Sequence, residues 1–85
     1  MDLKEQQKII FNYFKIGNFK KALIRSKKLL KKNPDNPGLH NIIGLAYFRL
    51  GEIDSSIQYF NNSLKILPNN LSALNNIANA YKKKM

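Results

Sequence analysis

The chain has 85 residues, no cysteine and a formal net charge of +10. This length suits one small domain with a modest core, which argues against a catalytic pocket walled on all sides. The absence of cysteine excludes disulfides and thiolate metal sites, and no apolar run approaches the ~20 residues that a membrane-spanning helix needs. The first residues, MDLKEQQK, are charged and unlike a secretory signal. The default prediction is therefore a soluble cytoplasmic protein.

The positive charge is concentrated in the first third of the chain. Residues 3–36 contain ten Lys and Arg against Glu5 and Asp35, whereas residues 37–70 contain two basic and two acidic residues. Three consecutive lysines, at 82, 83 and 84, add charge near the C-terminus. A strongly basic surface attracts anionic partners, so these two regions are the candidates for such contacts.

The first two predicted elements are helices over about 3–16 and 19–32. Asp2 and Glu5 resemble a capping box, which places the first helix start near Leu3, and Gly17 is expected to end that helix. Apolar residues recur at helical spacing in both segments. The residues expected to face the core are Ile9, Ile10, Tyr13, Phe14 and Ile16 in the first segment, and Phe19, Ala22, Leu23, Ser26, Leu29 and Leu30 in the second.

Three further helices are predicted after the breaker sequence NPDNPG. Asn36 and Pro37 form an N-cap and first-turn pair that starts a helix over about 37–50, and Gly51 ends it. A fourth helix is expected over about 53–67 and a fifth from about residue 71. Their expected buried residues are Leu39, Ile42, Ile43, Ala46, Tyr47 and Leu50, then Ile53, Ile57, Phe60 and Leu64, then Leu74, Ile77, Ala78 and Tyr81. No segment alternates with a period of two, so no strand is predicted.

Two stretches of the chain are related by a fixed offset of 34 residues. Shifted back by this offset, Ile43, Tyr47, Phe48, Gly51, Leu64, Lys65, Pro68 and Asn70 fall on identical residues at 9, 13, 14, 17, 30, 31, 34 and 36. The second copy also has Gly44, Tyr47, Gly51, Ser56, Phe60 and Pro68 at the spacing L-G-x-x-Y, A-x-x-x-F, P. The chain therefore resembles the tetratricopeptide repeat family over nearly its whole length.

This resemblance implies one all-α domain over residues 1–85, with a first repeat at 3–36, a second at 37–70 and a capping helix at 71–85. The implied fold is a right-handed superhelical stack of antiparallel helical hairpins with five helices. In such a stack the first helix of each hairpin lines the concave face and the second helix lines the convex face.

The first copy exchanges a small and a large residue relative to the second. Ile10 stands at the position of Gly44, and Ser26 stands at the position of Phe60. We interpret this exchange as one that conserves the volume between the two helices of a hairpin. His40 occupies the position where the family often has Trp, and we interpret it as a packing residue because no Cys or carboxylate lies at ligand spacing.

The resemblance also implies a function, which is to bind an extended segment of a partner protein in the concave groove. Amide side chains can pair with an extended backbone, while Phe11, Leu45 and Phe48 offer apolar contacts. The expected partner is another protein or peptide, and an acidic segment would match the positive charge of Arg49, Lys82 and Lys83. The groove candidates are Gln7, Phe11, Asn41, Leu45, Phe48, Arg49, Asn75, Asn79, Lys82 and Lys83.

One well-known ligand class of the family, the acidic C-terminal tails of chaperones, is disfavoured. The family holds these tails with a clamp of Lys, Asn and Arg side chains. The corresponding sites in this chain are Gln7, Phe11, Ile42, Ser72 and Asn76, none of which supplies a clamp charge.

The second predicted helix carries the basic run Lys20, Lys21, Arg25, Lys27, Lys28, Lys31 and Lys32. This run is either a solvated face or a surface for an anionic partner, nucleic acid or an acidic protein, with Lys20, Lys21, Lys27, Lys28 and Lys31 as candidates. No RNA-stacking module accompanies the lysines, because the aromatic residues lie on the core stripes. A third interpretation is a purely structural piece of a larger protein.

Nothing in the sequence indicates catalysis. The five acidic residues are scattered and form neither an acid–base pair nor a metal cage. The sequence contains neither a glycine-rich phosphate-binding loop nor a nucleophile-elbow motif. The sequence therefore predicts a protein that is not an enzyme and that has no metal and no cofactor.

Overall fold

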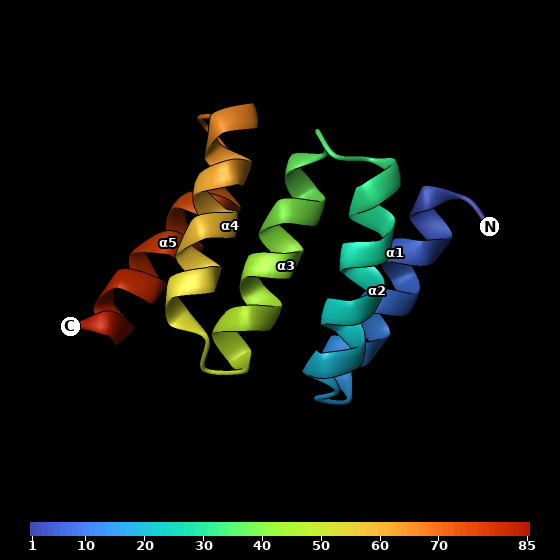
Figure 1. The fold of residues 1–85 in the computed structure, drawn as a ribbon, viewed down its shortest axis with the longest axis horizontal. Helices are drawn as coiled ribbons and strands as arrows, with labels where there is room; N and C mark the ends of the chain where they lie inside the picture. Colours follow the sequence, from blue (N-terminus) through green and yellow to red (C-terminus); the bar gives the residue numbers. More distant parts are fainter.

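A computed structural model describes all 85 residues, and it contains five α-helices joined by short turns (Figure 1). The predicted all-α fold is confirmed, and every helix begins at the expected residue and ends within about one or two residues of the expected end. The helices are α1 (Leu3–Lys15), α2 (Phe19–Lys32), α3 (Pro37–Arg49), α4 (Ile53–Ile66) and α5 (Leu71–Lys84). None of them combines the length and the apolar character that crossing a membrane requires.

Local capping interactions explain where the helices begin. The backbone amide of Glu5 donates to Asp2 Oδ1 at 2.8 Å, and that of Leu39 donates to Asn36 Oδ1 at 3.1 Å. Each bond satisfies a backbone donor that has no partner inside the helix. Asn18 and Asn70 cap α2 and α5 in the same way.

Glycine in the left-handed region explains where the first helix of each hairpin ends. Gly17 and Gly51 have φ values of 78° and 84°. Glycine adopts these values readily, whereas a residue with a Cβ atom would be strained there. After Gly51 the backbone amide of Glu52 donates to the Tyr47 carbonyl at 2.9 Å, which closes the helix end.

The helices stack as two antiparallel hairpins and one further helix. Figure 1 shows α3 between α2 and α4, with α1 behind α2 and α5 behind α4. A cluster of Ile10, Ala22, Leu29, Leu39 and Ile42 joins α1 and α2 to α3. A second cluster of Ile57, Phe60 and Ala80 joins α4 to α5. The seam between the hairpins is therefore as much a part of the core as the hairpins themselves.

Gly44 permits the close contact between α3 and α4. A Cβ atom at Gly44 would lie 2.5 Å from Cε1 of Phe60, whose side chain is fully buried. In the first hairpin the equivalent residues, Ile10 and Ser26, are also buried, at 1% and 0% exposure. This burial agrees with the exchange of large and small residues between the two hairpins.

Several residues expected in the core are exposed. On α5, Leu74 and Tyr81 are 41% and 48% exposed and Ala78 is exposed, whereas Ala73 and Ala80 are the buried residues. The reason is that α5 contacts α3 and α4 on one side and has no helix on the other. Ile16 and Leu50 are also exposed, because each is the residue that follows the last turn of its helix.

Candidate functional site

A hollow of about 240 Å³ lies between α3 and α5, and it contains four of the predicted groove residues. Leu45 and Phe48 are half-buried, and the buried ring of Phe60 completes the apolar part of the lining. Arg49 and Asn79 are exposed. The lining residues are Leu45, Phe48, Arg49, Phe60, Asn76 and Asn79. An apolar lining with a guanidinium and amides at its edge suits an apolar side chain attached to a polar backbone.

Asn41 is a predicted groove residue that bonds to another residue of the same chain. Its Oδ1 accepts a hydrogen bond of 3.0 Å from Nδ2 of Asn76, and both side chains are half-buried. The bond links α3 to α5. Asn75, and not Asn76, is the residue predicted for the groove, whereas in the structure Asn75 is exposed and does not line the hollow.

The remaining groove candidates lie away from this hollow. Phe11 is 50% exposed and lines a separate shallow hollow on α1, with Lys8, Asn12, Phe14 and Lys15. Gln7 is half-buried on α1, and Lys82 and Lys83 are exposed in the last turn of α5. Phe60 and Asn76 were missed as lining residues. The repeat pattern marked Phe60 only as a core residue. It placed Asn76 at a site of the family's charged clamp, where an asparagine supplies no charge, so Asn76 is not among the predicted groove residues.

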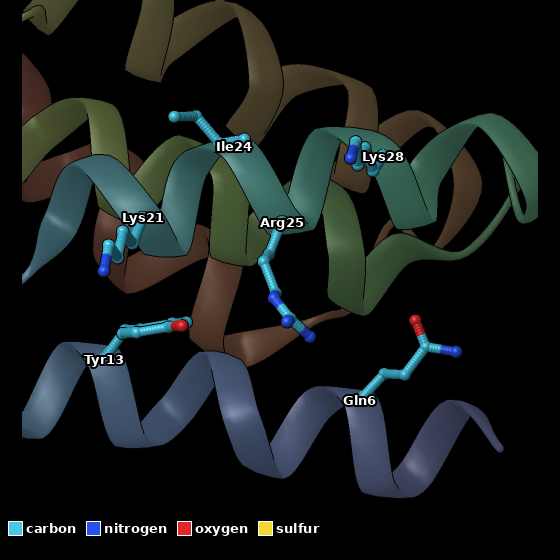
Figure 2. A pocket seen from close by; sticks show the side chains of 6 residues that line it. All are labelled: Gln6, Tyr13, Lys21, Ile24, Arg25 and Lys28. Atoms are coloured by element: carbon cyan, nitrogen blue, oxygen red, sulfur yellow. The ribbon is translucent and has the colours of Figure 1, made fainter. Parts of the chain in front are cut away.

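The anion-surface candidates on α2 are all exposed, but they divide between two sides of the helix. Lys27 Nζ donates a 3.0 Å hydrogen bond to the hydroxyl of Tyr47 on α3 and lies 5.6 Å from the centre of that ring. The bond to Tyr47 raises the pKa of Lys27. Lys21 lies near Tyr13 of α1 instead, and Lys28 lies further along α2 at the edge of the same groove between α1 and α2 (Figure 2). Lys20 and Lys31 take part neither in the bond to Tyr47 nor in the lining of the groove between α1 and α2.

His40 behaves as a packing residue. Its side chain is 9% exposed, its ring lies 5.9 Å from that of Tyr59, and Nε2 lies 2.8 Å from the carbonyl of Pro34. Since a carbonyl oxygen only accepts, Nε2 carries the proton and donates. No group of three or more His, Asp or Glu side chains is placed to hold a metal ion.

The family described as "Psidin, N-terminal TPR repeats region" matches residues 5–85. The chain belongs to the tetratricopeptide repeat family. Tetratricopeptide repeats are in general protein-interaction modules, so this is the class of function that the match supports.

Two curated relatives are similar to this chain over most of its length. A probable UDP-N-acetylglucosamine–peptide N-acetylglucosaminyltransferase, SEC, of Arabidopsis thaliana is 35% identical over 71 residues, which is 84% of this chain and 7% of that protein. The uncharacterized protein ycf37 of Pyropia yezoensis is 32% identical over 72 residues, 74% of this chain and 40% of that protein. The chain thus spans less than half the length of either relative, and the match with the transferase lies in its tetratricopeptide repeat region.

Solved structures of MamA share the fold. A MamA mutant is 25% identical with a TM-score of 0.83, and the match covers 95% of this chain and 59% of that one. The structure of MamA MSR-1 is 24% identical with a TM-score of 0.84, and the match covers 98% of this chain and 48% of that one. The tetratricopeptide repeat arrangement of all five helices is therefore shared with these proteins.

Proposed function

We propose that this tetratricopeptide repeat chain binds an extended segment of a partner protein at the hollow between α3 and α5. The observation that carries the proposal is the lining of that hollow. The half-buried side chains of Leu45 and Phe48 lie over the buried ring of Phe60 and beside the exposed polar groups of Arg49 and Asn79. The Arg49 guanidinium also lies 5.6 Å from the centre of the Phe19 ring, which holds it near α2. The apolar groups can contact a side chain of a peptide, and the polar groups can bond to its backbone or its carboxylates.

The chemistry of the lining favours an extended ligand with an apolar residue and a nearby carboxylate. The Asn79 amide offers both a donor and an acceptor, and the peptide groups of an extended segment are free to pair with it, unlike those inside a helix. Arg49 can hold a carboxylate through charge-assisted hydrogen bonds. Lys82 and Lys83, further along α5, add positive potential for an acidic segment.

A selection from a library of random peptides, followed by a single substitution, tests this proposal. Asn79→Ala is expected to lower the affinity for the selected peptides about fivefold, since a net hydrogen bond contributes about 1 kcal/mol. Asn79 is exposed in the free protein, so the melting temperature should stay unchanged. The matched control is Asn61→Ala, another exposed asparagine, on α4. Equal affinities for the two variants, measured by calorimetry, would show that the peptides bind elsewhere.

The hydrogen bond between Asn41 and Asn76, which lies at the hollow, is expected to contribute to stability. Asn41→Ala removes the acceptor for Asn76 and should lower the free energy of unfolding by about 0.5–1.5 kcal/mol. For a chain of this size, 1 kcal/mol corresponds to about 4–8 °C in melting temperature. Asn75→Ala, which removes an exposed amide on the same helix as Asn76, should leave the melting temperature unchanged. If Asn75→Ala proved to be the more damaging change in thermal unfolding, the structural role would belong to Asn75.

A further inference from the structure

A groove of about 550 Å³ runs between α1 and α2, at the opposite end of the stack from α5. Figure 2 looks onto this groove with the rest of the stack behind it, and shows Arg25 extending from α2 toward α1, between Tyr13 and Gln6. Ile24 is 59% exposed at the rim. The six lining residues are Gln6, Tyr13, Lys21, Ile24, Arg25 and Lys28. This groove is separate from the proposed peptide site between α3 and α5.

The charges in this groove are all positive and are not neutralised within the chain. Lys21, Arg25 and Lys28 line it, no lining residue is acidic, and the one ion pair in the structure joins Lys84 to Asp54 elsewhere. Like charges four residues apart on a helix disfavour each other. An anionic ligand would relieve this repulsion, so the groove has an electrostatic preference for such a ligand.

Comparison with the second repeat shows that this charge is specific to the first. The residues 34 positions after Lys21, Arg25 and Lys28 are Ser55, Tyr59 and Asn62, all uncharged. The equivalents of Gln6, Tyr13 and Ile24 are His40, Tyr47 and Gln58. The hairpin architecture therefore does not require three cations at these positions.

The second repeat also shows what the equivalent surface contacts. There the Tyr59 ring lies 5.9 Å from His40 and 5.6 Å from Tyr47, so aromatic rings fill the space. Helix α2 packs against α3, and its Lys27 bonds to Tyr47. A helix therefore covers this edge of the second repeat, whereas no helix of residues 1–85 covers the same edge of the first.

We propose that the groove between α1 and α2 binds an acidic amphipathic helix of a partner protein. Carboxylates of that helix would meet Lys21, Arg25 and Lys28, and an apolar side chain would contact Ile24. The cations lie at spacings of four and three residues, spanning about 10 Å of the α2 axis. Carboxylates at the same spacing on one face of a partner helix match that span.

The observations favour an acidic protein helix over the other occupants. Lys21 Nζ lies 5.9 Å from the centre of the Tyr13 ring, so one face of the only aromatic ring in the groove is already covered and is not open for stacking a nucleic-acid base. A second copy of this chain would bring further positive charge, since each copy carries a net charge of +10 and α5 ends in three lysines, of which only Lys84 is paired.

The probe is a labelled, Ala-rich peptide of about 18 residues, long enough to form a helix. It carries three glutamates at spacings of four and three on one face, with a leucine between them. A control peptide has the same composition with the glutamates spread around the helix. Binding to the full chain is measured by fluorescence anisotropy at about 50 mM salt. The patterned peptide should bind at least about tenfold more tightly than the control peptide.

Charge reversal then locates the site. Arg25→Glu should weaken the patterned peptide about tenfold or more, whereas Lys31→Glu, the same charge change on an exposed residue of α2 outside the groove, should weaken it less than about threefold. Circular dichroism checks that both variants remain folded, and the double variant Lys21→Ala with Lys28→Ala provides a second removal of groove charge with the same expected loss.

Four results would overturn the proposal. The first two are equal losses of affinity for Arg25→Glu and Lys31→Glu, and equal affinities for the two peptides. The other two are tighter binding of a labelled oligouridine than of the patterned peptide, and a dimer in sedimentation that Arg25→Glu abolishes. Asn79→Ala should leave the patterned peptide unaffected, and Arg25→Glu should leave the library-selected peptides unaffected. The proposal for this groove and the proposal for the hollow between α3 and α5 can therefore be tested independently.

Discussion

Phe60→Ala is expected to lower the free energy of unfolding by about 3–5 kcal/mol. The Phe60 side chain is fully buried, belongs to the cluster that joins α4 to α5, and lies directly against α3 at Gly44. Its removal leaves a cavity shared by three helices. A chain of this size is expected to have a total stability of only about 4–13 kcal/mol, so this loss is a large part of the whole.

Urea denaturation followed by far-ultraviolet circular dichroism measures this loss. The matched control is Phe11→Ala, the same substitution at a side chain that is 50% exposed on α1. The control should cost less than half as much, because less apolar surface leaves the core and no closed cavity forms. A comparable loss at Phe11 would mean that Phe60 is not the centre of the joint between these helices.

Gly44→Ile is expected to cost about 2–3 kcal/mol, although isoleucine is the better helix former. The new Cβ would lie 2.5 Å from the Phe60 ring, and that ring is fully buried, so the two helices must move apart. Thermal unfolding measures the loss. A Gly44→Ile variant as stable as the parent would show that α3 and α4 are not in close contact at this position.

A double variant tests the exchange of volume that the first hairpin contains. Gly44→Ile combined with Phe60→Ser copies the pair Ile10 and Ser26 into the second hairpin. Each change alone should destabilise, the first by crowding and the second by a cavity, and each relieves the defect of the other. The combined loss should therefore be smaller than the sum of the single losses by more than about 1 kcal/mol. Strict additivity would show that the two positions do not share one space.

Most of the fold could be predicted from the sequence because its signals are local. The left-handed φ values at Gly17 and Gly51 and the caps at Asp2 and Asn36 depend on neighbouring residues alone. The offset of 34 residues then identified the hairpin as the repeated unit. These features determined five helices, their order and nearly all of their ends.

The candidate site could be predicted only in part. Four of the predicted groove residues, Leu45, Phe48, Arg49 and Asn79, line one hollow, whereas the others lie elsewhere. The choice between Asn75 and Asn76 could not be made in advance, because adjacent residues on a helix point about 100° apart and the rotation of α5 against α3 decides which one faces its neighbour.

Burial on α5 and the division of the α2 cations were likewise decided by the tertiary structure. Helical periodicity marks an apolar stripe, but a stripe is buried only where another helix covers it, and Leu74 and Tyr81 lie on the uncovered side of α5. The basic run on α2 reads as one charged stretch in the sequence. Packing against α3 on one side and α1 on the other gives Lys27 a tyrosine partner and leaves Lys21, Arg25 and Lys28 around an open groove. The sequence by itself determined the helices and the total charge, whereas the neighbours of each side chain depend on how the helices are rotated and stacked.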